Sequence, residues 1–122
     1  CSSLRKINLD GIKTNKVTSL YKIFTNCISL TSINLKSFDT SDVREMSMMF
    51  DNCTYLEKID LSNFDTSKVV NMNYVFRNYE KLKSVNLTGF VFDTTKDISR
   101  MFYNCTSLES LDLSMFNSKK NY

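Results

Sequence analysis

Leucine recurs every 26 residues along this chain, at positions 4, 30, 56, 82 and 108. When each of these leucines is numbered position 0 of a repeat, most other apolar residues also fall at fixed positions. These are position 3 (Ile7, Ile33, Ile59, Val85, Leu111), position 5 (Leu9, Leu35, Leu61, Leu87, Leu113), position 8 (Ile12, Phe38, Phe64, Phe90, Phe116), position 16 (Leu20, Met46, Met72, Ile98), position 19 (Ile23, Met49, Val75, Met101) and position 20 (Phe24, Phe50, Phe76, Phe102). A fixed period of this length is typical of arrays of stacked repeats.

The first third of each repeat has the pattern of a short strand. Positions 3 and 5 are apolar and flank a polar position 4, which is the alternation expected of a strand with one buried face. The strand should be about four or five residues long. The mostly aromatic position 8 is expected to turn the chain into the core.

The middle of each repeat resembles the beginning and the apolar face of a short helix. Asp, Thr and Ser at 39–41 and at 65–67 are residue types that accept hydrogen bonds from the free N–H groups at a helix start. Val43, Met46, Met49 and Phe50 follow at the spacing of one apolar helix face. The helices should end near Asn52 and Asn78, because Asn tolerates the left-handed conformation that closes a helix. In the fourth repeat the Asp-Thr pair comes about two residues late, which predicts a longer corner and a helix shorter by about half a turn.

A single repeat cannot bury its own apolar faces, so the repeats must stack. Their strands would then pair in parallel, through connections that are almost always right-handed. The sequence therefore predicts an α/β fold, a right-handed solenoid with short parallel strands on one face and short helices on the other. Residues 1–122 should form one solenoid segment of about four and a half repeats, interpreted as part of a longer array.

Composition disfavours several classes of function. The net charge is +3, and acidic and basic residues are scattered along the chain, with a basic doublet at Lys119-Lys120, so nucleic-acid binding is not expected. No apolar run reaches the length of a membrane span, and no signal peptide is visible. The chain has no His, and Gly11 and Gly89 stand alone, so we expect no catalytic residue, no cofactor and no metal. Asp39 and Asp65 fit a corner or cap.

The four cysteines all occupy position 23, where Tyr79 replaces the fifth. We interpret Cys1, Cys27, Cys53 and Cys105 as an inward column of free thiols. The alternative is a Cys27–Cys53 bridge, which needs Cα atoms within about 7 Å. Zinc is disfavoured without a C-x-x-C motif or His. Cys1 also fits the lipid-bearing cysteine of a bacterial lipoprotein, although its repeat register favours a structural role.

Polar residues at positions 2, 4 and 6 form one outward surface along the predicted strands. One interpretation is a solvated polar ladder, and the other is a stripe that contacts a protein or glycan partner. A calcium site around Asp60 is disfavoured, because an aligned row does not surround an ion. The candidate contact residues are Lys6, Asn8, Asp10, Ser32, Asn34, Lys36, Lys58, Asp60, Ser62, Ser84, Asn86, Thr88 and Asp112.

Residues 49–69, with the string M-F-D-N-C-T-Y-L-E-K-I-D-L-S-N-F-D-T-S-K-V, resemble the BspA-like leucine-rich repeat family. The closer similarity is to the branch found in mycoplasma lipoproteins and other bacterial surface proteins, and it extends over essentially the whole chain. The resemblance implies a leucine-rich-repeat-like, non-enzymatic module that is displayed on the cell surface or secreted. Its partners would be proteins or glycans on host or neighbouring cells, without direct membrane insertion by this segment. A structural spacer that displays another domain is the alternative.

Overall fold

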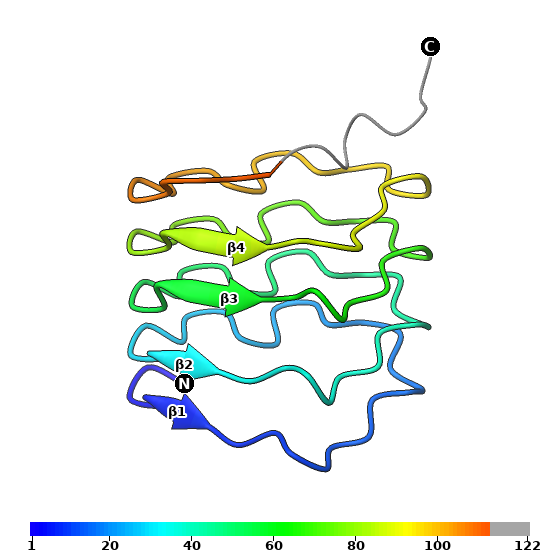
Figure 1. The fold of residues 1–122 in the computed structure, drawn as a ribbon, viewed down its shortest axis with the longest axis horizontal. Coiled ribbons are helices and arrows are strands. Elements are labelled where there is room, and N and C mark those ends of the chain that lie inside the picture. Colours follow the sequence, from blue (N-terminus) through cyan, green and yellow to red (C-terminus); the bar gives the residue numbers. More distant parts are fainter. Residues whose placement is uncertain (113–122) are drawn as a thin grey trace.

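The computed structural model describes residues 1–112, in which the chain winds into stacked coils of one 26-residue repeat each (Figure 1). Leu113, Phe116, Lys119 and Lys120 lie outside the described residues. Each of the first four coils contributes one short strand. The strands are β1 (Lys6–Ile7), β2 (Ser32–Ile33), β3 (Lys58–Asp60) and β4 (Ser84–Asn86).

The strands pair in parallel at the 26-residue register, in two separate two-stranded sheets. β1 pairs with β2 so that Lys6 lies opposite Ser32, and β3 pairs with β4 so that Lys58 lies opposite Ser84. β2 also contacts β3, although the two do not belong to one sheet. On another side of the coils, parallel bridges join Ser19 to Glu45, Glu45 to Asn71 and Asn71 to Asp97. Neighbouring coils are therefore hydrogen-bonded at more than one point around their circumference.

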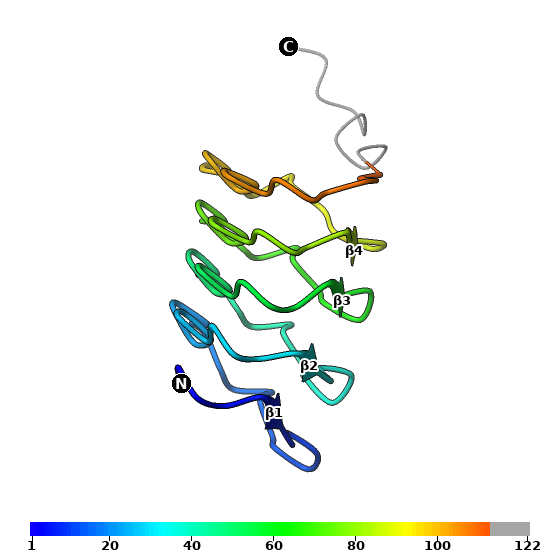
Figure 2. The same cartoon turned by 90° about the vertical axis from the view of Figure 1, so that its left-hand side faces the viewer.

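The predicted helices are wrong, because the described residues contain only short strands and turns. The α/β solenoid with helices on one face is therefore corrected to stacked coils with a double turn in place of each helix, at 21–26, 47–52, 73–78 and 99–104. Figure 2 shows these double turns along one edge of the stack and the strands toward the other. Each double turn holds two non-glycine residues with left-handed φ, such as Met48 (55°) and Asn52 (61°).

The direction of the backbone N–H groups explains why no helix forms. In a helix, each N–H would bond to the carbonyl four residues back. Here the N–H groups of Met46 and Met48 instead donate to the carbonyls of Asn71 and Asn73 in the next coil, each at 3.0 Å. Phe50 and Asn52 continue the series with the carbonyls that lie 25 residues ahead of them. Alternate residues of the double turn are thus bonded to the neighbouring coil.

The Asp-Thr-Ser segment closes a corner instead of capping a helix. The Asp39 carboxylate accepts hydrogen bonds from the backbone N–H of Ser41 (3.0 Å) and from its hydroxyl (2.6 Å). These hydrogen bonds lower the pKa of Asp39, and Asp65 is held in the same way by Ser67. The expected corner role of both carboxylates is therefore confirmed, and only the helix that should follow is wrong.

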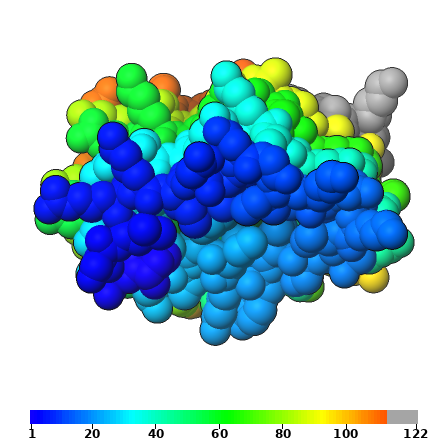
Figure 3. Space-filling view, turned by 90° about the horizontal axis from the view of Figure 1, so that it is seen from below, coloured from blue at the N-terminus to red at the C-terminus, as the bar shows by residue number. Residues whose placement is uncertain are grey.

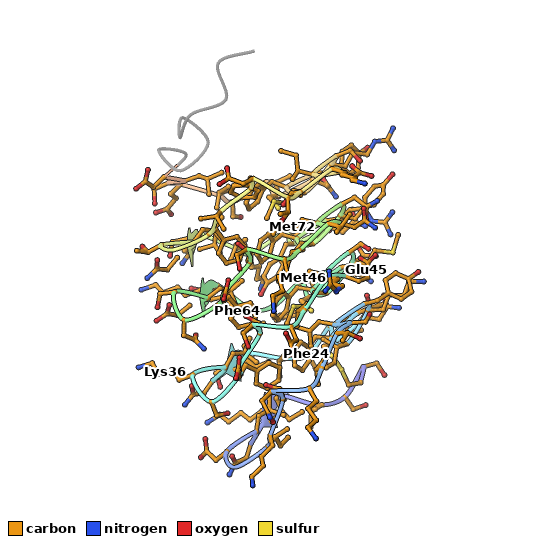
Figure 4. The ribbon with its side chains drawn as sticks, turned by 90° about the vertical axis from the view of Figure 1, so that its right-hand side faces the viewer. Phe24, Lys36, Glu45, Met46, Phe64 and Met72 are labelled. Atoms are coloured by element: carbon orange, nitrogen blue, oxygen red, sulfur yellow. A yellow bond between two sulfur atoms is a disulfide. The ribbon has the colours of Figure 1, made fainter. Side chains whose placement is uncertain are left out.

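Apolar side chains at the repeated positions fill the interior in columns. Phe24, Phe50, Phe76 and Phe102 stack with successive ring centroids 5.3, 5.9 and 5.2 Å apart. Met46 and Met72 are fully buried, and Figure 4 shows them in the interior while Lys36 projects outward. Burying each large apolar side chain stabilises the fold by about 1.5–3 kcal/mol. The core therefore runs as one spine through the stack.

The first coil shows how much of this burial comes from the neighbouring coils. Leu4 and Ile12 are 38% and 45% exposed, whereas the equivalent Leu30 and Phe38 in the second coil are 0% and 5% exposed. An apolar hollow of about 370 Å³ lies at this end of the stack, which Figure 3 views from below. Residues at the same repeat position are thus buried in the second coil, which packs on the first, and partly exposed in the first coil.

A column of buried threonines joins the corners of successive coils. The Thr40 hydroxyl donates to the carbonyl of Asp65 (3.0 Å) and accepts from the N–H of Asp65 (2.8 Å). Thr14 bonds in the same way to Asp39, and Thr66 bonds to Val91. All three threonines are buried, and each hydroxyl satisfies two part-buried backbone groups of the next coil.

The cysteine column is only partly a column of free thiols, as it contains a Cys1–Cys27 disulfide with Cα atoms 4.8 Å apart. The prediction that Cys1 and Cys27 are free is therefore wrong, and so is the alternative Cys27–Cys53 bridge. Cys53 and Cys105 are free, and each thiol donates to a carbonyl of the coil below at 3.0 Å. Burial raises the pKa of Cys53 to about 12, which keeps it a neutral thiol.

The fourth coil absorbs its shifted Asp-Thr pair within a few residues. Thr94 and Thr95 donate their hydroxyls back to the carbonyl of Val69, at 3.0 and 3.2 Å. Asp97 already pairs with Asn71 at the normal register. The longer corner is therefore local, and the shorter helix expected after it is wrong because a double turn follows there too.

We predict that Thr40→Val lowers the free energy of unfolding by about 1–3 kcal/mol, because it leaves two part-buried backbone groups of Asp65 without their hydrogen-bond partner. Thr18→Val is the matched control, since Thr18 is exposed. Urea denaturation of the three proteins measures the difference. Equal midpoints for Thr40→Val and Thr18→Val would contradict the role assigned to the threonine column.

Tyr79 replaces Cys in the fourth coil and is fully buried, and its hydroxyl has no hydrogen-bond partner in the described structure. Burying an unpaired hydroxyl costs about 1–3 kcal/mol. We therefore expect Tyr79→Phe to raise the melting temperature, whereas Tyr103→Phe, at an exposed ring, should leave it unchanged. Differential scanning calorimetry distinguishes the two, and a clearly destabilised Tyr79→Phe would show that the hydroxyl is satisfied after all.

Candidate partner-binding face

The predicted contact residues do come together on one surface, which we call the strand face. Its members at positions 2, 4 and 6 are exposed, apart from the half-buried Ser84. Parallel pairing aligns Lys6 with Ser32 and Lys58 with Ser84, and a further bridge aligns Ser84 with Ser110. The residues at each position therefore form a column along the stack. Asp112 is exposed and follows the last bridge, outside the named strands.

The residues at position 4 serve the local backbone. The side-chain oxygen of Asn8 accepts a hydrogen bond from the N–H of Asp10 (2.8 Å), and Asn34 does the same for Lys36 (3.0 Å). Asp60 and Asn86 repeat this contact with the residues two places further on. Such Asx turns close the bend that follows each strand. The four side chains therefore stabilise turns and do not bond to one another as a ladder.

Electrostatics on the strand face is set by lysines and by one ion pair. Hydrogen bonds from Ser62 lower the pKa of Asp60, and the positive charge of Lys36 lowers it further. At position 1, Glu57 and Lys83 form an ion pair of 2.9 Å, which lowers the pKa of the carboxyl and raises that of the amine. The negative charge of Glu57 is therefore offset by the positive charge of Lys83 in the coil above it.

Three lysines of the strand face have no such partner. Lys6, Lys36 and Lys58 are exposed, and among residues 1–112 no hydrogen bond or ion pair holds their ammonium groups. A flexible, hydrated ammonium group on a rigid backbone can pair with an anionic group of a partner. These lysines are therefore cationic residues of the predicted set that are available for contact.

An aromatic residue beside the strand face was not among the predicted contact residues. Position 25 is Ser in three repeats, but it is Tyr55 in the second and Lys81 in the third. Tyr55 is exposed, and the Lys81 ammonium lies 4.2 Å from the centroid of its ring. Two surface grooves, of about 460 and 770 Å³, both use Tyr55 in their walls. The departure from Ser at this position was the signal that could have identified it.

A second cation–aromatic cluster lies on the double turns. Arg77 forms two hydrogen bonds with Asp51, at 2.9 and 2.6 Å, and its guanidinium lies 4.7 Å from the centroid of the Tyr74 ring. Arg100 lies about 6 Å from both Tyr74 and Tyr103. Since Arg77 is paired with a buried carboxylate, we interpret this cluster mainly as a structural brace between coils.

Other kinds of site find no support in the part of the chain that the structure describes. No group of three or more Cys, Asp or Glu side chains there could hold a metal ion. None of its segments forms a helix with the length and apolar character needed to cross a membrane. The strand face and the neighbouring grooves therefore remain as the candidate site.

Comparison with known proteins places the chain in a family but supplies no function. No curated protein and no solved structure matches it. A family described as "Mycoplasma protein of unknown function, DUF285" matches residues 1–121, which is nearly the whole sequence. This match agrees with the mycoplasma part of the resemblance stated above. The chain therefore belongs to the DUF285 family of mycoplasma proteins of unknown function.

Proposed function

We propose that this chain is a non-enzymatic repeat module of a cell-surface or secreted protein, and that its strand face binds protein or glycan partners. The observation that carries the proposal is the set of three unpaired lysines, Lys6, Lys36 and Lys58, on a face of parallel columns. The resemblance to BspA-like repeat proteins supports it, because members of that family are displayed on bacterial surfaces and associated with adhesion.

The structural roles of the other repeat positions also support binding at this face. Inward positions form the spine, the position-4 side chains close turns, and the threonine column joins the corners. The lysines at positions 2 and 6 perform none of these duties. Residues without a structural duty on a rigid scaffold can be selected for recognition, and solenoids commonly bind partners along such extended faces.

The alternative is a structural spacer, and the bonding between coils favours it. Hydrogen bonds at the double turns join each described coil to the next, and hydrogen bonds at the strands join the first coil to the second and the third to the fourth. A stack connected in this way would hold another domain at a fixed distance. A spacer would need no particular charge on its strand face, which makes the two functions separable by mutation.

We predict that the triple variant Lys36→Gln, Lys58→Gln, Asp60→Asn weakens capture of the chain on host cells or matrix proteins by roughly 10-fold. Each charged contact at an interface contributes about 0.5–1 kcal/mol. Asn at position 60 keeps the turn intact, because Asn34 and Asn86 already perform this role in neighbouring coils. Surface plasmon resonance on immobilised matrix proteins, together with cell-binding assays, measures the change.

The matched control is Lys16→Gln, Glu80→Gln, Lys96→Gln, which makes the same change in net charge at exposed residues outside the strand face. The control should bind like the wild-type chain, and circular dichroism should show all three proteins equally folded. If both triple variants are captured as well as the wild type, binding through the strand face is excluded and the spacer remains.

A further inference from the structure

The two grooves beside the strand face share a wall. Both are lined by Tyr55 and Thr31, and together they extend from the first coil to the third. Tyr55 immediately precedes the fully buried Leu56, so its backbone is anchored in the core while its side chain is about half exposed. The ring therefore offers an exposed aromatic surface to both grooves, with the Lys81 ammonium 4.2 Å from its centroid. None of the structural roles described above requires an aromatic residue at this position.

The charge around Tyr55 is strongly positive. Arg5 and Lys6 line one groove, and Lys58 and Lys81 line the other. The one carboxylate among the lining residues is Glu57, which is paired with Lys83. The grooves therefore present cationic groups that can pair with carboxylate or sulfate, and Arg5 can do so through two parallel hydrogen bonds.

Two hydroxyl groups of these grooves are held as acceptors. Ser29 donates its hydroxyl hydrogen to the carbonyl of Ser2 (2.5 Å), and Thr31 donates to the carbonyl of Arg5 (3.2 Å). Each oxygen retains lone pairs once its hydrogen is engaged in the fold. A ligand can therefore donate hydrogen bonds to these two oxygens in addition to pairing its anionic groups with the cations.

We propose that the grooves around Tyr55 bind an acidic oligosaccharide, an inference that rests on the partner-binding function proposed above. The apolar face of a sugar ring packs on the aromatic ring, its hydroxyls donate to Ser29 and Thr31, and its carboxylate or sulfate groups pair with Arg5 and Lys81. An acidic peptide supplies carboxylates, but it has no sugar ring whose apolar face packs on Tyr55 while its hydroxyls donate to Ser29 and Thr31. The combination of aromatic surface, hydroxyl acceptors and cations therefore favours a sugar over a peptide.

The test titrates the isotopically labelled full chain with defined hexasaccharides and follows its NMR signals. The probes are a heparin-derived hexasaccharide that carries sulfate and carboxylate, a hyaluronan hexasaccharide that carries carboxylate only, and neutral maltohexaose. We expect at least one acidic probe to shift the signals of Tyr55, Thr31 and Arg5, and maltohexaose to shift none. The two acidic probes distinguish carboxylate recognition from sulfate recognition.

Variants separate recognition by the grooves from attraction to net charge. Tyr55→Ala should weaken binding of the acidic probe about 10-fold, whereas Tyr55→Phe should retain it because the ring remains. Arg5→Gln with Lys81→Gln should weaken binding and reduce its dependence on salt. The matched controls are Tyr21→Ala, an equally exposed tyrosine with a lysine 5.1 Å from its ring, and Lys16→Gln with Lys96→Gln. Both controls should bind like the wild type.

Three outcomes would overturn the inference. They are the absence of binding to both acidic probes, an equal loss in Tyr21→Ala and Tyr55→Ala, and tighter binding of an oligoglutamate peptide than of either acidic sugar. The capture assay keeps this result separate from the wider proposal. If the strand-face triple variant loses capture while no acidic sugar binds, partner binding stands and the glycan assignment fails.

Discussion

The hydrogen bonds between the double turns of successive coils are the constraint on which the rest of this structure depends. Even-numbered residues such as Met46, Met48 and Phe50 donate to carbonyls 25 residues ahead, so each coil can be satisfied only by a neighbour of matching length. An insertion that shifted the double turn of one coil would misalign its backbone groups with those of the neighbouring coils. This explains why the shifted Asp-Thr pair of the fourth coil is corrected before Asp97, which again pairs with Asn71.

The same constraint shows how far the sequence could predict the fold. Burial at fixed positions is visible in a sequence, so the period and the buried Leu30, Phe50 and Phe76 were predicted correctly. The helices were wrong because a double turn buries the same apolar positions that one face of a helix would bury. The deciding residues stand at position 18, where Lys22, Met48, Tyr74 and Arg100 all adopt left-handed φ. These residue types have no preference for that conformation, so no local signal distinguished a turn from a helix.

The cysteine column shows a different limit, in which one repeat position has several outcomes. Cys53 and Cys105 each donate a thiol to a carbonyl of the coil below, and Tyr79 fills the same place with a ring. Among the described residues, no carbonyl plays this role for Cys1 or Cys27, and their sulfur atoms bond to each other. The spacing of 26 residues is the same throughout the column. The outcomes differ in the contact that each side chain makes with the neighbouring coil, and a repeat pattern alone does not describe that contact.

The residues of the candidate site were only partly predicted from the sequence, for a related reason. The repeat positions grouped residues that the structure also places on one surface. They did not distinguish Asn34, which closes a turn, from Lys36, whose ammonium group is unpaired. Tyr55 was not predicted, because an aromatic residue occurs at position 25 in only one repeat and leaves no recurring pattern. Many recurring residues of the stack join coils, so the proposed recognition of a partner would depend on exposed residues that differ between coils. Tyr55 and Lys81 replace the serine of other repeats beside the strand face. They are therefore exposed residues that the stacking of coils does not explain.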